Sequence, residues 1–160
     1  MKYLQVATIG TVLALNAGMA MRAAVMAGEP NDPSRFTYAR LYCTADGETH
    51  FQNVAVDFSK NRIAPPAAAI YVGGNLPASG VYFSGFEPGW GAPDLENRLN
   101  HPAPATQFVT VLHGVFSVTA TDGETRWLRA GDVLRVEDTS PCKGHITVVG
   151  DQGGYLMITR

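Results

Sequence analysis

The clearest structural signal in this chain lies in residues 107–136, which read QFVTVLHGVFSVTATDGETRWLRAGDVLRV. Runs of alternating and β-branched residues predict short strands, and turn residues separate them. Asp122-Gly123 is a dipeptide typical of a tight hairpin turn. We expect a strand at 107–113 that ends beside Gly114, a hairpin partner at 115–121, and two further strands at 125–128 and 133–136.

The same pattern of short alternating or β-branched runs, separated by turn residues, continues on both sides of this segment and predicts an all-β domain. The other expected strands are residues 38–44, 49–58, 68–72, 80–86, 145–149 and 155–158, the last two joined through residues 150–154. About nine or ten short strands are enough for a double-sheet jelly-roll barrel over residues 35–160. Residues 87–106 contain four prolines and Trp90. A loop of that length is usually functional or packed over a core edge.

Length and charge narrow the class of protein. A chain of 160 residues has room for one domain. The formal net charge is −2 and the twelve Lys and Arg residues are scattered singly, so the sequence indicates no basic surface. This pattern excludes a nucleic-acid partner and favours a small-molecule ligand.

Residues 1–27 have the pattern of a secretory signal peptide, with Lys2 at the start, an apolar stretch at 4–15, and small residues before Ala20 and Ala27. A membrane anchor is the alternative, since residues 3–21 carry no charge and a span needs about 20 residues. Glycine, threonine and asparagine weaken such a span. We expect cleavage after Ala20 or Ala27, an exposed lead-in at 28–34, and an exported protein, periplasmic or secreted, without a stable membrane span.

Cys43 and Cys142 are the two cysteines of the chain. Export would allow one disulfide between them. A single pair is optional in a domain of this size, and a small buried thiol is the commoner state. The sequence leaves both states open and slightly favours the thiols.

Two of the four histidines bracket the best-patterned part of the chain. His101 precedes the strand that opens with Gln107, and six residues separate Gln107 from Gly114. Gly131-Asp132 precedes a later strand, and His145 follows beyond it. A histidine and a side-chain oxygen before one strand, and a second histidine across a hairpin, predict convergence at one barrel mouth.

This arrangement resembles the cupin superfamily, whose first motif carries two histidines, a glutamate and then a glycine, and whose second motif runs from Gly-Asp to a histidine. Leu99 and His101 stand at or near the first two positions, Gln107 at the glutamate, and His145 at the end of the second motif. The likeness covers about residues 99–160. It is closest to small bacterial cupins in which glutamine replaces the glutamate. The resemblance implies a cupin barrel with an incomplete metal-ligand motif.

A complete cupin metal site has three histidines and one carboxylate, whereas this chain retains His101, Gln107 and His145. Glutamine is a poor ligand for transition metals. The resemblance therefore implies at most a weak site for Zn, Mn, Fe or Ni formed by these three residues. His50 could supply a third nitrogen from a neighbouring strand.

Catalysis, if present, is assigned to His101 and His145, because imidazole serves as general acid or base near neutral pH without a metal. Inward positions recur at every second residue of a barrel strand. On this basis the expected contacts to a substrate are His50, Trp90, Val109, Val111 and Thr147, with Trp90 as a lid in the long loop.

Structural roles are the alternative for several residues. His101 could cap the proline-rich loop, and His113 is expected to be a turn residue beside Gly114. Glu137 and Asp138 are candidates for a carboxylate pair, but adjacent strand residues point to opposite faces. Turn-stabilising roles are therefore favoured for these two carboxylates.

Three classes of function remain open at this stage, because a fold does not fix a reaction. The first is an enzyme acting on a small polar molecule, namely an isomerase, lyase or oxygenase. The second is a binding module that holds a small ligand without chemistry, which the neutral Gln107 slightly favours. The third is a structural barrel that forms a homodimer through an exposed sheet edge.

The exported form is expected to begin after Ala20 or Ala27. N-terminal sequencing of the mature protein tests this expectation, and an intact Met1 in a membrane fraction would indicate an anchor instead.

Overall fold

The all-β class is confirmed by the computed structural model, which describes residues 32–92 and 100–160. The strands in these residues are β1 (Arg35–Cys43), β2 (Thr49–Asp57), β3 (Ser59–Asn61), β4 (Ile70–Val72), β5 (Val81–Phe86), β6 (Gln107–Ala120), β7 (Thr125–Arg129), β8 (Val133–Val136) and β9 (His145–Thr159). No helix in the described ranges is long and apolar enough to cross a membrane. The expected signal segment, as well as Leu99, lies outside the described residues.

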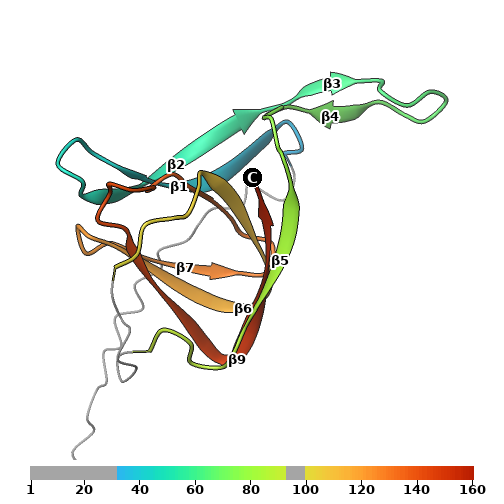
Figure 1. Ribbon diagram of the computed structural model, residues 1–160. Helices are drawn as coiled ribbons and strands as arrows, with labels where there is room; N and C mark the ends of the chain where they lie inside the picture. Colours follow the sequence, from blue (N-terminus) through green and yellow to red (C-terminus); the bar gives the residue numbers. More distant parts are fainter. Residues whose placement is uncertain (1–31, 93–99) are drawn as a thin grey trace, which may run out of the picture.

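Seven strands form one hydrogen-bonded sheet in the order β2-β1-β8-β6-β9-β5, with β7 also paired to β6 (Figure 1). β1 and β8 run parallel, and the other pairs of this sheet are antiparallel. The first half of β6 pairs with β8 and its second half with β7, while β9 accompanies both halves. The two layers expected from the sequence are therefore continuous with each other through β6 and β9.

The hairpin expected at Gly114 and the connection between two strands expected at residues 150–154 are wrong, because β6 and β9 each run through those positions as one strand. Gly114 lies opposite Gly154, and the register of the β6–β9 pair shifts on both sides of Gly114. Gly114 has φ +87°, and a side chain there would collide with the carbonyl oxygen of Gly153. These glycines bend the sheet without ending its strands. His113 is accordingly a strand residue paired with Tyr155.

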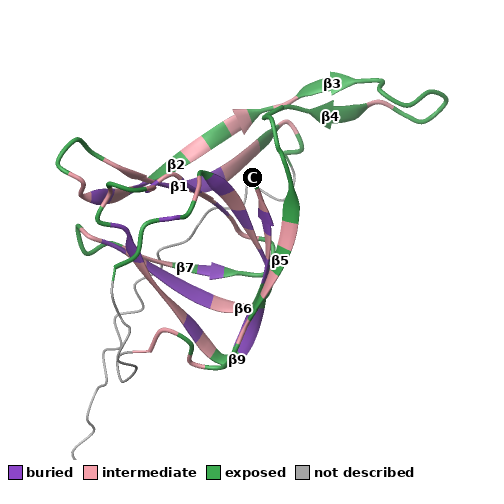
Figure 2. Cartoon of the chain, viewed as in Figure 1, coloured by how far each residue is buried: buried purple, intermediate pink, exposed green. Residues whose placement is uncertain are grey.

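The core lies on the inner side of the curled sheet, where β1, β6, β7, β8 and β9 contribute buried aliphatic and aromatic side chains (Figure 2). Phe116, Leu41 and Leu128 are the largest fully buried side chains. Burying a residue of this kind contributes about 1.5–3 kcal/mol. By contrast, the β3–β4 hairpin projects from the body and is exposed along both strands.

The loop before β9 is fastened to the turn between β1 and β2. Cys43 and Cys142 form a disulfide with a Cα–Cα distance of 6.1 Å, so the expectation of free thiols is wrong. Thr49 Oγ1 donates to the carbonyl of Gly144 at 2.8 Å, and Lys143 forms an ion pair with Glu48. The hydrogen bond from Lys143 lowers the pKa of the Glu48 carboxyl, and the same contact raises the pKa of Lys143. The segment of residues 142–144, directly before His145, is therefore held at several points.

Replacing Gly114 with Ala tests the bend. Gly123 has a similar φ of +91°, but the space that a side chain would enter there is open, so Gly123→Ala is the matched control. The left-handed conformation alone costs about 1–2 kcal/mol for alanine. We expect Gly114→Ala to lower the free energy of unfolding, measured by urea denaturation, by at least about twice that amount. Equal losses for the two variants would contradict the close approach of Gly153.

Candidate functional site

A cavity of about 130 Å³ opens inside the curled sheet, at the end where the loop residues 101–104 meet β9. Its walls are mainly aliphatic and aromatic, with a few polar side chains. The lining residues are Phe86, Trp90, His101, Ala103, Pro104, Gln107, Val109, Phe116, Val118, Leu128, Leu134, Val136, His145, Thr147, Leu156 and Ile158. Small-molecule sites in proteins have this composition, an apolar wall with few polar groups.

Three residues singled out from the sequence, His101, Gln107 and His145, line this one cavity. Gln107 opens β6 and His145 opens β9, which places them at opposite ends of an antiparallel pair. The bend at Gly114 and Gly154 folds the pair over, so that both ends face the same space. Trp90, Val109 and Thr147 also line the cavity. The roles of all these residues stay predictions.

His145 forms a buried pair with Asp138. Its Nδ1 lies 2.7 Å from Asp138 Oδ2, the Asp138 side chain is 0% exposed, and His145 is 8% exposed. An ionised carboxylate can only accept a hydrogen bond, so the proton of this contact lies on Nδ1. Nε2 is then the ring nitrogen turned away from Asp138. The pair has the arrangement of an oriented general acid or base.

A short extended segment after residue 100 connects the two members of this pair. His101 exchanges backbone hydrogen bonds with His145, at 3.0 and 3.1 Å, and Ala103 N–H donates to the carbonyl of Asp138 at 3.1 Å. The His101 and His145 rings have centroids 4.6 Å apart. Gly144 has φ +86°, and a side chain there would collide with the backbone of His101. A glycine directly before His145 is thus a requirement of this contact.

Gln107 is held by two residues that the sequence does not indicate. Its Oε1 lies 3.2 Å from Arg160 Nε and 3.2 Å from the Tyr82 hydroxyl. Arg160 Nη2 donates to the Tyr82 hydroxyl at 2.9 Å, and the guanidinium lies over the Tyr82 ring. Both acceptor positions of the amide oxygen are therefore occupied by donors.

Trp90 covers the cavity from the long loop. Its ring packs edge-on against Phe86 with centroids 5.1 Å apart. Val149 N–H donates to the Trp90 carbonyl at 2.8 Å, and Gly89 N–H donates to the Gly150 carbonyl at 3.2 Å. The loop is thereby fixed to β9 beside the cavity, and the role of Trp90 as a lid stays a prediction.

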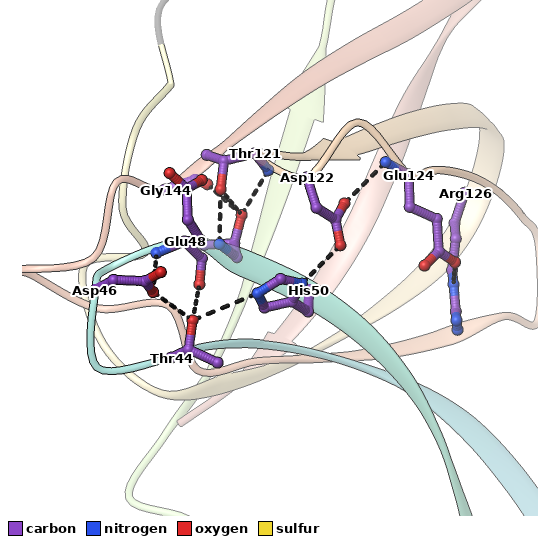
Figure 3. A network of polar contacts seen from close by, with 10 residues as sticks. Thr44, Asp46, Glu48, His50, Thr121, Asp122, Glu124, Arg126 and Gly144 are labelled. Carbon is purple, nitrogen blue, oxygen red and sulfur yellow. Dashed lines mark hydrogen bonds and ion pairs between the residues drawn. The ribbon is translucent and has the colours of Figure 1, made fainter.

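His50 and Val111 do not line the cavity. Figure 3 shows His50 between Asp122 and Thr44, with Nδ1 at 2.7 Å from Asp122 Oδ2 and Nε2 at 3.4 Å from Thr44 Oγ1. The parity of β2 turns His50 away from its buried neighbours Thr49 and Phe51. Val111 is 1% exposed and belongs to the packed core, beside the register shift in β6.

The residues at the cavity do not fit a resident metal. In the described ranges no group of three or more His, Cys, Asp or Glu side chains is placed to hold an ion. Gln107 cannot add its oxygen, since Arg160 and Tyr82 donate to it. His145 has one ring nitrogen engaged by Asp138. At most two imidazoles remain, which is fewer than the three or four protein ligands of usual transition-metal sites.

Asp138, Tyr82 and Arg160 are the site residues that sequence reasoning missed. The sequence favours a turn role for Asp138. Both carboxylates lie just after β8, and they face different surroundings: Asp138 is buried, while Glu137 forms ion pairs with Arg40 and Arg135. The only signal is a carboxylate seven positions before a histidine. Nothing in the spacing indicates Tyr82 or Arg160, which reach Gln107 from β5 and from the residue after β9.

Comparison with known proteins gives one match. Residues 98–150 match the family model of the EutQ-like cupin domain. No curated protein and no solved structure matches the chain. The matched range contains β6, β7, β8 and the start of β9, and with them His101, Gln107, Asp138 and His145.

Protein purified without added ions is expected to contain well below one divalent metal ion per chain by inductively coupled plasma mass spectrometry. Gln107→Glu combined with Arg160→Met provides the positive control, because it places a carboxylate without an arginine partner in the same cavity as the two imidazoles and is expected to raise the Zn²⁺ affinity at least about tenfold. A stoichiometric ion retained by the wild type after desalting would contradict the ligand set described above.

Proposed function

The chain belongs to the cupin superfamily, and from this premise we propose that it binds a small organic molecule in its cavity and transfers a proton to or from it through His145. The single observation that carries the proposal is the buried Asp138–His145 pair, of which His145 lines an apolar cavity. Export to the periplasm or beyond remains part of the proposal.

Burial makes the pair suited to proton transfer. A carboxylate removed from water is costly unless it is paired, and the His145 ring is the hydrogen-bond partner of the Asp138 side chain in the described residues. Asp138 therefore holds the ring in one tautomer and stabilises the imidazolium that forms when Nε2 takes up a proton. The same roles belong to the aspartate of a Ser-His-Asp triad.

The chemistry that follows uses the protein's own residues. Nε2 of His145 removes a proton from a carbon or oxygen of the bound molecule and returns it at another position, while Asp138 keeps Nδ1 protonated. The walls that surround this exchange are mainly apolar, which limits the number of water molecules that they can hold by hydrogen bonds. Isomerisation by a proton shift requires both halves of this exchange, dehydration requires proton removal from carbon and proton delivery to the leaving hydroxyl, and decarboxylation requires proton delivery to the carbanion left by loss of CO₂.

A binding protein without chemistry is the second candidate. The neutral Gln107 in place of a carboxylate favours it, because the lining then contains two imidazoles and no carboxylate to serve as a second group of opposite role. A homodimer formed through an exposed sheet edge is compatible with either candidate.

Asp138→Asn tests the acid–base role more cleanly than His145→Ala, which would leave a buried carboxylate unpaired at a cost of about 3–5 kcal/mol. With cyclohexanone in D₂O as the probe, we expect the wild type to accelerate exchange of the protons next to the carbonyl. The variant is expected to lose at least about a hundredfold of that acceleration. The measurement is the ¹H NMR signal of the probe.

Binding is measured in the same samples from the methyl NMR shifts of Val109, Leu128 and Leu156, and it is expected to change little in the variant. Unchanged exchange rates in Asp138→Asn would contradict the acid–base role and favour the binding module. Absence of methyl shifts with the probe would contradict the cavity as a ligand site.

A further inference from the structure

We infer that the ligand of the cavity carries a carboxylate, which Gln107 recognises through its amide NH₂ group because Arg160 and Tyr82 hold the amide oxygen on the other side. The inference rests on the proposed function and adds the chemical class of its ligand. It also assigns to Arg160 and Tyr82 a positioning role, since both act through Gln107.

The orientation of the Gln107 amide follows from donor chemistry. A guanidinium has five N–H donors and no acceptor, so the amide atom that faces Arg160 Nε at 3.2 Å must be oxygen. Tyr82 completes a closed triangle: its hydroxyl accepts from Arg160 Nη2 at 2.9 Å and donates to the same amide oxygen at 3.2 Å. A flipped amide would place N–H groups against these donors. The NH₂ group of Gln107 is thereby fixed on the opposite side.

The NH₂ group is available to a ligand. Gln107 lines the cavity and is 9% exposed, and none of the hydrogen bonds within residues 32–92 and 100–160 uses its Nε2. The polar part of the lining therefore presents N–H donors from Gln107 in the same cavity as the ring of His145. No Asp or Glu is among the described residues that line the cavity. Such a wall selects a group with several acceptor lone pairs.

The charge behind Gln107 favours an anion over a neutral acceptor. Arg160 takes part in none of the ion pairs found in the described residues. An outer hollow of about 240 Å³ lies beyond Gln107 and is lined by Arg160 and Arg135, of which Arg135 is paired with Glu137. The Arg160 guanidinium is itself exposed, but its contact with Gln107 is partly buried, so its positive charge still acts on the cavity side of the amide with partial screening. A carboxylate gains from that charge, whereas an alcohol does not.

The volume of the cavity limits the rest of the ligand. An apolar cavity of about 150 Å³ is large enough for benzene, and the cavity here has about 130 Å³. The ligand is therefore a monocarboxylate whose apolar body has about the size of a six-membered ring or a short alkyl chain. Benzoate is a suitable probe, and benzyl alcohol is its neutral counterpart of nearly the same shape.

Isothermal titration calorimetry of the wild type with the two probes tests the inference. Benzoate is expected to bind at least about tenfold more tightly than benzyl alcohol, as charge-assisted hydrogen bonds exceed neutral ones. Gln107→Glu keeps the side-chain shape but replaces the NH₂ group with an oxygen. It is expected to weaken benzoate binding at least about tenfold and to leave benzyl alcohol within about threefold.

Arg160→Met is the second variant, and Arg129→Met is its matched control. Arg129 lies exposed on β7 and does not line the cavity, so it reports the effect of net charge alone. We expect Arg160→Met to reduce the preference for benzoate over benzyl alcohol at least about fivefold and Arg129→Met to leave it unchanged. Circular dichroism establishes that each variant is folded.

The outcomes separate this inference from the proposed function. Equal affinity of the wild type for both probes, or a preference unaffected by Gln107→Glu and by Arg160→Met, would overturn the carboxylate assignment and leave the small-molecule site standing. Failure of both probes to bind the wild type would count against the proposed function as well, as would absence of methyl shifts with cyclohexanone.

Discussion

The bend of the β6–β9 pair, where Gly114 lies opposite Gly154, governs the position of the cavity residues. A straight strand of the fourteen residues of β6 would be about 45 Å long, at roughly 3.3 Å per residue. Gln107 and His145 would then stand at distant ends of an antiparallel ladder. Because two glycines allow the strands to fold over, these ends face each other across one apolar space. The backbone conformation at these two glycines therefore determines which side chains can meet in the cavity.

The buried charge of Asp138 makes the stability of the fold depend on the segment around His145. The carboxylate of Asp138 is completely buried, and its loop is fastened by the Cys43–Cys142 disulfide, by Thr49 through the Gly144 carbonyl, and by the backbone of His101 and Ala103. A buried charge tolerates little displacement of its partner. The disulfide and hydrogen bonds around residues 138–145 hold the His145 ring in place, and a displaced ring would leave the Asp138 carboxylate buried without its partner.

The sequence was sufficient for the all-β class, for the positions of most strands and for the three polar residues that meet at the cavity. Alternation and turn dipeptides are local signals, and they identify strands well. They failed at Gly114 and at 150–154, because a glycine that bends a strand and a glycine that ends one look the same without the partner strand. Tyr82 and Arg160 were missed for a related reason: a hydrogen bond across 53 or 78 positions leaves no periodic trace.

The continuity of β6 and β9 through both halves of the sheet also bears on how fast a ligand can exchange. Two halves that share unbroken strands cannot separate as rigid bodies without breaking the ladder that joins them, so slow hinge closure is unavailable to this fold. The backbone around Trp90 is tied to β9 by two hydrogen bonds. Within the described residues of this part of the rim, these bonds leave the Trp90 indole free to rotate about its side-chain bonds, and side-chain rotation is among the fast motions of a protein. Residence of a ligand would then be set by its contacts with the walls and hardly at all by a gate.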